Sequence, residues 1–312
     1  MTMNYNKINP VPLDPIRTIN SGQVFLWENH NNSWYGIDGN YILKITITGK
    51  ERYKLSENKK FLSELENIDI DYNAFPEYKN WNYHFFRLYD NQELINKTLS
   101  KDPSILNIYK KYKGLRLIRQ DPFQCIISFV CASNTNIKRI RYMLKNITKK
   151  FGKRVIYNNI NFNLFPTVNE LSEASIEELI GCGLGYRSKF VKSISNHIKN
   201  NLDLNSLKDM KYLEAKTELT KLFGIGNKIA DCILLFSLEK TEAFPIDIWV
   251  YRALFQYYGW MFKDNSLIKS IMVPENKYKL IHNKINDYFG KYSGYVQQYL
   301  YYHIRESNKR TW

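Results

Sequence analysis

Lys228 and Asp247 are the side chains whose type and local sequence best suit covalent chemistry. Lys228 follows a Gly-Ile-Gly turn and opens a predicted helix. The positive end of the helix dipole favours the neutral form of a lysine there, and a neutral amine is a nucleophile. Taken alone, a lysine in this position would more often contact a phosphate. Asp247 follows Pro245 and precedes an apolar helix, which by itself indicates an ordinary N-cap.

The turn before Lys228 is typical of a phosphate-binding hairpin. Gly224 and Gly226 separate two apolar helices, can adopt a positive φ and allow another backbone to approach closely. The amides that follow them open a helix, where the dipole favours an anion. These features predict a sequence-independent grip on one DNA phosphate. The alternative is a plain turn between two helices.

The elements that must position these residues fall into two parts. Residues 20–75 alternate apolar and polar positions between turn-rich tracts, which predicts an antiparallel sheet. The strands expected are 24–27, 33–37 and 43–48. From about residue 90 the hydrophobic period is that of helices. The helices expected are 122–131, 137–151, 175–180, 187–200, 213–222, 228–238, 247–258, 276–289 and 294–306.

The fold class expected is α+β. An N-terminal antiparallel β-sheet domain, residues 1–116, would pack on a predominantly α-helical domain, residues 117–312, which contains the hairpin. The sequence has no internal repeat and no low-complexity linker, so we expect the two domains to pack tightly.

Composition favours a globular protein with a polyanionic partner. Of the 312 residues 44% are hydrophobic, and 45 Lys and Arg against 30 Asp and Glu give a formal net charge of +15. DNA, RNA or an anionic membrane surface would suit that charge, although lysines can simply keep a protein soluble. Basic residues recur along helical stretches such as 138–150, so the charge does not come from one tail.

The cysteines and the N-terminus predict an intracellular, soluble protein. The four cysteines lack C-x-x-C spacing, which argues against a structural zinc site or a disulfide framework. The first residues, 1–6, contain no apolar signal core, and no run of 18 apolar residues occurs. We expect no membrane association, and a cytoplasmic, nucleoid-associated location in a prokaryote or a nuclear one in a eukaryote.

Together the hairpin, Lys228 and Asp247 resemble the helix-hairpin-helix DNA glycosylase superfamily. The resemblance implies that the lysine attacks the sugar C1′ and forms a Schiff base. The aspartate would stabilise positive charge on the sugar and assist proton transfer. A lysine at this position implies a bifunctional glycosylase and lyase. No cysteine follows Cys232, so the iron–sulfur cluster of the endonuclease III and adenine glycosylase branches is excluded.

Over nearly the whole chain the sequence is similar to the long form of 8-oxoguanine DNA glycosylase, which implies a base pocket. In the segment 21–27, the carbonyl of Gly22 would accept the N7 hydrogen that distinguishes 8-oxoguanine from guanine. Gln297 would bind the Watson–Crick edge, and Tyr301 and Cys232 would stack on the two faces of the purine. The alternative is that these residues have no role in binding, in which case Gly22 only starts a strand and Cys232 is only a buried core residue.

The same resemblance implies contacts to the cytosine left behind in the duplex. Asn134 and Arg139 fall on positions that read this base. Tyr186 follows a glycine-rich turn and would wedge into the stack, while Arg187 would contact the cytosine. The alternatives are purely structural: the residues around Asn134 would form a polar helix cap, and Tyr186 would pack on a loop.

The activity implied is excision of 8-oxoguanine, preferably opposite cytosine, from double-stranded DNA by a monomer without cofactor or metal. Two alternatives remain open: a glycosylase for another damaged purine, alkylated or ring-opened, and a non-catalytic DNA-binding module. Three residues depart from the family pattern. Trp249 replaces the histidine of eukaryotic members, Phe223 a frequent proline, and Tyr301 a frequent phenylalanine.

Overall fold

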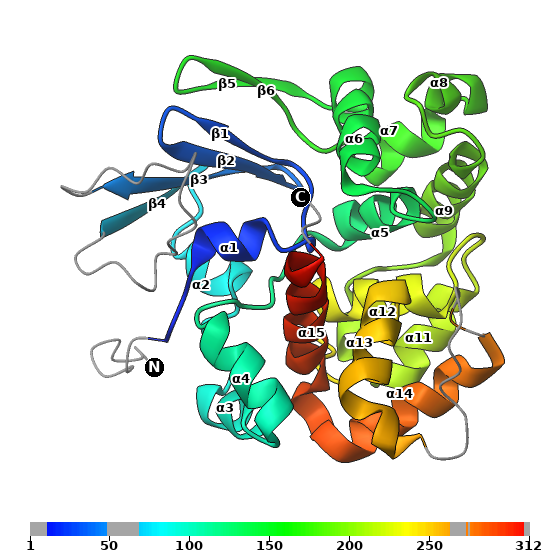
Figure 1. The fold of residues 1–312 in the computed structure, drawn as a ribbon. Coiled ribbons are helices and arrows are strands. Elements are labelled where there is room, and N and C mark those ends of the chain that lie inside the picture. Colours follow the sequence, from blue (N-terminus) through cyan, green and yellow to red (C-terminus); the bar gives the residue numbers. More distant parts are fainter. Residues whose placement is uncertain (1–10, 49–68, 263–272, 274, 309–312) are drawn as a thin grey trace.

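The N-terminal part is a four-stranded antiparallel sheet in a computed structural model that describes residues 11–48, 69–262, 273 and 275–308 (Figure 1). The strands follow chain order in the sheet. They are β1 (Trp27–His30), β2 (Ser33–Asp38), β3 (Tyr41–Thr48) and β4 (Asp69–Phe75). Asn31 and Asn32, both with positive φ, form the first tight turn, as is typical of two-residue hairpin loops. The N-terminal segment 1–6 discussed above lies outside the described residues.

The sheet buries residues on both faces. Leu43 and Ile45 of β3 pack with Trp81 and Phe85 of α2 (Trp81–Phe85) in a small separate core. Side chains of the opposite face, such as Ile42, belong instead to the main core shared with the helices. The sheet is therefore attached to the helical part through apolar packing.

The remaining helices lie beside and below the sheet in Figure 1. Helix α1 (Pro15–Ile19) lies next to the sheet, whereas α3 (Gln92–Leu99) and α4 (Pro103–Lys111) lie farther below it in Figure 1 and contact the C-terminal helix. The larger helical part contains α5 (Pro122–Cys131), α6 (Ile137–Phe151), α7 (Val168–Glu173), α8 (Ile176–Gly181), α9 (Arg187–Asn201), α10 (Ser206–Asp209), α11 (Tyr212–Thr220), α12 (Asn227–Phe236), α13 (Ile248–Tyr258), α14 (Glu275–Phe289) and α15 (Ser293–Ser307). Helix α15 runs through the middle of the molecule, between α4 and α13.

The α+β fold class is confirmed, and most predicted elements exist. The strand expected at 24–27 is shifted, since pairing with β2 begins at Trp27 and the residues before it are a buried extended segment. A second hairpin, β5 (Arg154–Tyr157) and β6 (Ile160–Asn163), was not predicted. Among the described residues, no helix is long and apolar enough to cross a membrane.

Local sequence explains where the helices of the site begin. Asp121 and Asn136 accept backbone N–H bonds at the starts of α5 and α6, at 2.8 and 2.9 Å. Capping boxes start α7 and α8. Asp247 caps α13, as predicted, accepting from Trp249 N at 2.9 Å and from Val250 N at 2.8 Å.

Candidate active site

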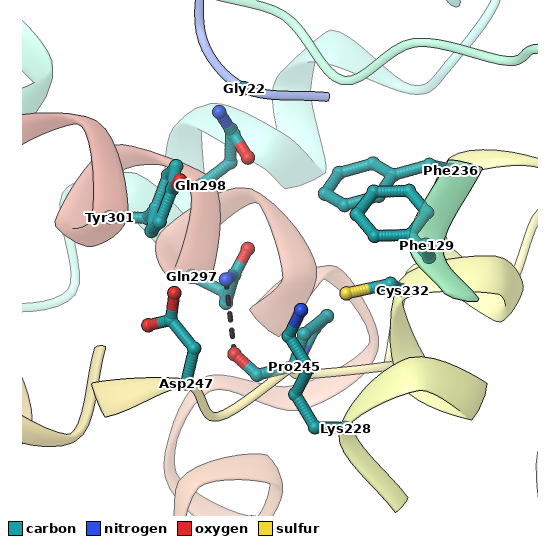
Figure 2. Close-up of a pocket in the computed structure, with 10 residues that line it drawn as sticks. All are labelled: Gly22, Phe129, Lys228, Cys232, Phe236, Pro245, Asp247, Gln297, Gln298 and Tyr301. Carbon is teal, nitrogen blue, oxygen red and sulfur yellow. Dashed lines mark hydrogen bonds between the residues drawn. The ribbon is translucent and has the colours of Figure 1, made fainter. Parts of the chain in front are cut away.

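Six residues expected to act on the base or sugar line one pocket between α12, α13 and α15 (Figure 2). They are Gly22, Lys228, Cys232, Asp247, Gln297 and Tyr301. The pocket has a volume of about 40 Å³ and adjoins a groove of about 530 Å³. The pocket is continuous with the groove, because both are lined by Gly22, Lys228, Asp247 and Tyr301.

The hairpin before α12 has the geometry its glycines predict. Gly224 has φ of +94°, and a Cβ there would lie 2.5 Å from Cγ of Phe190, so only glycine fits. Gly226 is the N-cap of α12, and a Cβ there would meet no atom within 4 Å. Because this N-cap residue is glycine, it brings no side chain to the first amides of α12. The hairpin thus presents a helix start that could receive an anion.

Lys228 extends from the first turn of α12 into the pocket (Figure 2). Its Nζ lies 5.5 Å from the ring centroid of Phe129, which stacks on Phe236. Cys232, one turn further along α12, is buried beside it. Burial raises the pKa of the Cys232 thiol to about 12, although the positive charge of Lys228 acts in the opposite direction. The thiol is therefore neutral at pH 7 and offers an uncharged, polarisable surface.

Asp247 faces Lys228 across the pocket floor (Figure 2). Both of its cap bonds use Oδ1, so Oδ2 is the oxygen left for chemistry. Burial raises the pKa of this carboxyl above its ordinary value, while Lys228, the two cap bonds and Arg305 lower it. Burial is the largest of these effects, so the fold holds a carboxylate where its charge is unfavourable.

One face of α15 supplies the opposite wall through residues spaced four apart, Gln297, Tyr301 and Arg305. Gln297 donates from Nε2 to the carbonyl of Pro245 at 3.1 Å, and its buried Oε1 has no hydrogen-bond partner within the described part of the chain. A buried acceptor in this condition suits a ligand that supplies the missing donor. Burial, together with the nearby Asp247, raises the pKa of the Tyr301 hydroxyl.

Gly22 closes the pocket from the N-terminal part. Its φ is +84°, a value that favours glycine. The residues on either side are fixed, because Gln298 Nε2 donates to the Ser21 carbonyl at 3.1 Å and Gln23 Nε2 donates to the Arg116 carbonyl at 2.8 Å. The backbone of residue 22 is therefore held at a defined position relative to α15.

The residues expected to read the opposite base gather where two loops meet the starts of α6 and α9. Asn134 and Tyr186 lie in the loops, and Arg139 and Arg187 lie in the first turns of the helices. Arg187 donates to the carbonyls of Ser133 and Asn134, and its guanidinium lies 4.6 Å from the ring centroid of Tyr186. Tyr186 is 54% exposed, as a wedge would need to be. Arg139 donates to the Gly183 carbonyl at 3.1 Å. Only Asn134 of the four lines the groove.

Several lining residues were not predicted. Phe129, Phe236 and Gln298 lie on apolar helices whose sequence does not separate pocket wall from core. Arg305 was also missed, although its spacing of four from Tyr301 places both on one helix face. The departures Trp249 and Phe223 differ in setting: Trp249 lines the groove, whereas Phe223 is exposed and packs edge-on against Phe190.

Comparisons with known proteins agree with this geometry. Residues 6–126 match the N-terminal domain of 8-oxoguanine DNA glycosylase, and residues 127–282 match the HhH-GPD superfamily of base excision DNA repair proteins. A probable N-glycosylase/DNA lyase of Methanothermobacter thermautotrophicus is 29% identical over 231 residues, covering 67% of this chain and 70% of that protein. The N-glycosylase/DNA lyase OGG1 of Arabidopsis thaliana is 32% identical over 218 residues, covering 67% of this chain and 57% of the plant protein.

A solved structure resembles nearly the whole chain. It is the 8-oxoguanine glycosylase/lyase of Clostridium acetobutylicum in complex with double-stranded DNA containing cytosine opposite 8-oxoguanine. The TM-score is 0.77 at 29% identity, and the match covers 95% of this chain and 93% of that one. The chain therefore belongs to the HhH-GPD superfamily of base excision DNA repair enzymes, within the 8-oxoguanine DNA glycosylase/lyase family.

Proposed function

We propose that this protein excises 8-oxoguanine from double-stranded DNA and then cleaves the strand through a lysine Schiff base. The observation that carries the proposal is the meeting of Lys228, Asp247 and Gln297 in one pocket, beneath the carbonyl-bearing turn at Gly22. A non-catalytic DNA-binding module would need the hairpin but would have no use for an amine and a carboxylate in a closed pocket.

The chemistry proceeds at C1′ of the flipped nucleotide. The Lys228 amine attacks C1′, and the bond to N9 breaks with its electron pair leaving on the base, which takes up a proton. Loss of a proton from the amine and opening of the C1′–O4′ bond give a Schiff base. Removal of a C2′ proton then expels the 3′ phosphate by β-elimination, and water hydrolyses the Schiff base to restore Lys228. The Asp247 carboxylate stabilises the positive charge that develops on the sugar.

Base selection rests on two acceptors in the pocket. The Oε1 of Gln297 would accept from the Watson–Crick edge of the purine, and the Gly22 carbonyl would accept from N7–H, which guanine lacks. Cys232 and Tyr301 would contact the two faces of the ring. Flipping costs a few kcal/mol, which these contacts and the inserted Tyr186 offset.

We propose a preference for cytosine opposite the lesion. Arg187, Arg139 and Asn134 offer donors and acceptors near the exposed Tyr186. In the free protein, both arginines bond loop carbonyls through Nη2. A guanidinium carries five N–H donors, so each side chain can keep this bond and offer other donors to cytosine. Excision opposite each of the four bases, compared between wild type and Arg187→Ala, tests this preference. Equal rates opposite all bases, or an unchanged preference in the variant, would refute it.

The main test is borohydride trapping on duplexes that carry 8-oxoguanine, an alkylated purine, a ring-opened purine or an abasic site. We expect a covalent product with 8-oxoguanine and with the abasic site, and none from Lys228→Gln, which should still bind DNA. Trapping by this variant would show that another amine is the nucleophile. Preferential trapping on an alkylated or ring-opened purine would assign a different lesion to the same machinery.

A further inference from the structure

Arg305 lines the groove that adjoins the pocket. It lies on α15, four residues after Tyr301. Its guanidinium carbon is 5.6 Å from the ring centroid of Tyr301 and 5.7 Å from that of Trp249 on α13. Two aromatic rings therefore restrict the side chain and interact favourably with its charge. A guanidinium ordered in this way loses less entropy when it binds an anion.

The groove contains few charged side chains that could contact DNA phosphates. Among its lining residues in the described part of the chain, only Lys228 and Arg305 are cationic, and only Asp247 is anionic. A nucleotide turned into the pocket brings its own phosphates to the mouth of the groove. Lys228 must reach C1′ with a neutral amine, so it cannot serve as the cation for these phosphates.

We propose that Arg305 binds a backbone phosphate next to the flipped nucleotide, with Trp249 and Tyr301 as its aromatic supports. This assignment rests on the proposed function in two respects: a nucleotide enters the pocket, and Lys228 is the nucleophile rather than a phosphate contact. Guanidinium and phosphate match in geometry, and the charge-assisted bonds are stronger than neutral ones. The contact would fix the sugar against Lys228, because the phosphate is attached directly to that sugar.

The chain supplies a matched control on the same aromatic ring. Arg252 of α13 lies 5.0 Å from the ring centroid of Trp249, closer than Arg305 does. It is exposed and is not among the residues lining the groove. Replacing either arginine removes one positive charge and one contact to Trp249, but of the two only Arg305 lines the groove.

The test combines protein variants with DNA modifications and compares their separate and joint effects on binding, as in a double-mutant cycle. Wild type, Arg305→Gln and Arg252→Gln are titrated with a duplex that carries tetrahydrofuran, an uncleavable abasic-site analogue. The duplex has either normal phosphates or one neutral methylphosphonate at each phosphate flanking the analogue, one position at a time. This binding assay needs neither a damaged base nor turnover, so it reads Arg305 even if the lesion assignment fails.

We expect Arg305→Gln to bind the normal duplex about tenfold to hundredfold more weakly than wild type, as for loss of one charged hydrogen-bonded contact. At one flanking position, methylphosphonate should weaken DNA binding by wild type and by Arg252→Gln to a similar extent. The same modification should reduce the affinity of Arg305→Gln little further, because this variant has already lost the contact. The slope of log K against log salt should fall by about 0.9 in Arg305→Gln, beyond any change in Arg252→Gln. Arg305→Lys should recover part of the affinity.

Two outcomes would overturn the proposal. Methylphosphonate could weaken Arg305→Gln as much as wild type at every position, which would show that no flanking phosphate meets this side chain. Alternatively, Arg305→Gln and Arg252→Gln could have equal affinities and salt slopes, which would reduce Arg305 to a general surface charge. Thermal unfolding of each variant separates a binding loss from misfolding.

Discussion

Asp247, the carboxylate of the proposed mechanism, is held in a state that the surrounding fold does not favour. Asp247 is a carboxylate whose pKa is raised by burial despite the cap bonds and the nearby Lys228. Catalysis needs its charged form, because only a carboxylate stabilises a cationic sugar. The site therefore keeps an ionised group at some cost in stability, as active sites commonly do.

Asp247→Asn should be more stable than wild type at neutral pH, and the difference should shrink as the pH falls. The folded-state pKa of Asp247 lies above its ordinary value of 3.8, so the folded state binds the proton more tightly than the unfolded state does. Stability from the protonated form is complete below the unfolded pKa and is lost as the pH rises through the folded one. Asparagine stays neutral throughout and caps helices as well as aspartate does.

Thermal unfolding of both proteins between about pH 4 and about pH 8 measures this difference. Other titrating groups are shared and cancel in the comparison. A gap in melting temperature that does not change with pH would contradict the prediction. The prediction would also be contradicted if the melting temperature of wild type rose relative to that of Asp247→Asn toward neutral pH. The fold would then stabilise the charged form of Asp247.

Gly22→Ala should slow 8-oxoguanine excision more than it slows cleavage of pre-formed abasic sites. Two effects act at this position. A side chain at φ of +84° strains the backbone by about 1–2 kcal/mol, and displacement of the carbonyl weakens its contact with N7–H. Strain alone lowers both activities together, so the ratio of the two rates in one preparation isolates recognition. Equal losses would mean that Gly22 is only structural.

At the scale of elements, a buried polar network joins the two segments that carry Lys228 and Asp247, the residues proposed to be catalytic. Asp231 lies on α12 between Lys228 and Cys232 and is fully buried. Its carboxylate accepts from the hydroxyls of Tyr212 and Tyr278, each at 2.7 Å. Lys216 also donates to it, at 3.0 Å. The Tyr278 hydroxyl in turn accepts from Ile246 N at 3.1 Å, directly before Asp247.

Tyr278→Phe should lower both stability and excision. The substitution leaves the buried Ile246 N–H without its acceptor, at a cost of about 1–3 kcal/mol, and frees the Asp247 segment from α12. Tyr257→Phe is a matched control, since its hydroxyl bonds His303 away from the pocket. Melting temperature and single-turnover excision well below it are the measurements. Full excision at that temperature would show that the network only supports the fold.

The sequence predicted which residues meet in the pocket better than it predicted the elements around them. Lys228 and Asp247 stand at local signals, a glycine turn and a helix cap, but these signals alone favour a phosphate contact and an ordinary cap. Their expected catalytic roles come from the resemblance to the DNA glycosylase superfamily. Phe129 and Phe236 could not be predicted, because wall and core residues have the same apolar pattern. The β5–β6 hairpin was missed because its strands are four residues each and its Asn158-Asn159 turn sits inside a helical region.

At the scale of the whole molecule, we propose the two domains 1–116 and 117–312, with a pocket that neither completes alone. Gly22 comes from the first, and Lys228 and Asp247 come from the second. Buried side chains bond across the boundary. The Oε1 of Gln23 accepts from Ile118 N at 3.0 Å, and Gln298 donates to the Ser21 carbonyl.

We therefore expect one cooperative unfolding transition rather than one for each domain. Separate domains often unfold separately, because the interfaces between them are small and polar. Here the main core contains apolar side chains of both parts. For example, Phe25 packs edge-on against Phe129, with 5.8 Å between the two ring centroids. Loss of the sheet would expose this core to water, so neither part should remain folded after the other opens.

Pulsed hydrogen exchange during urea unfolding, resolved by peptide, measures the two parts in one sample. Peptides from β2 and β3 should lose protection at the same urea concentration as peptides from α12 and α15. The separated fragment 117–312 should lack a stable fold and give no borohydride trapping on 8-oxoguanine, because the Gly22 turn is missing. Two distinct midpoints, or a fragment that folds and traps, would show that the helical part is an independent enzyme and that the sheet only adds to it.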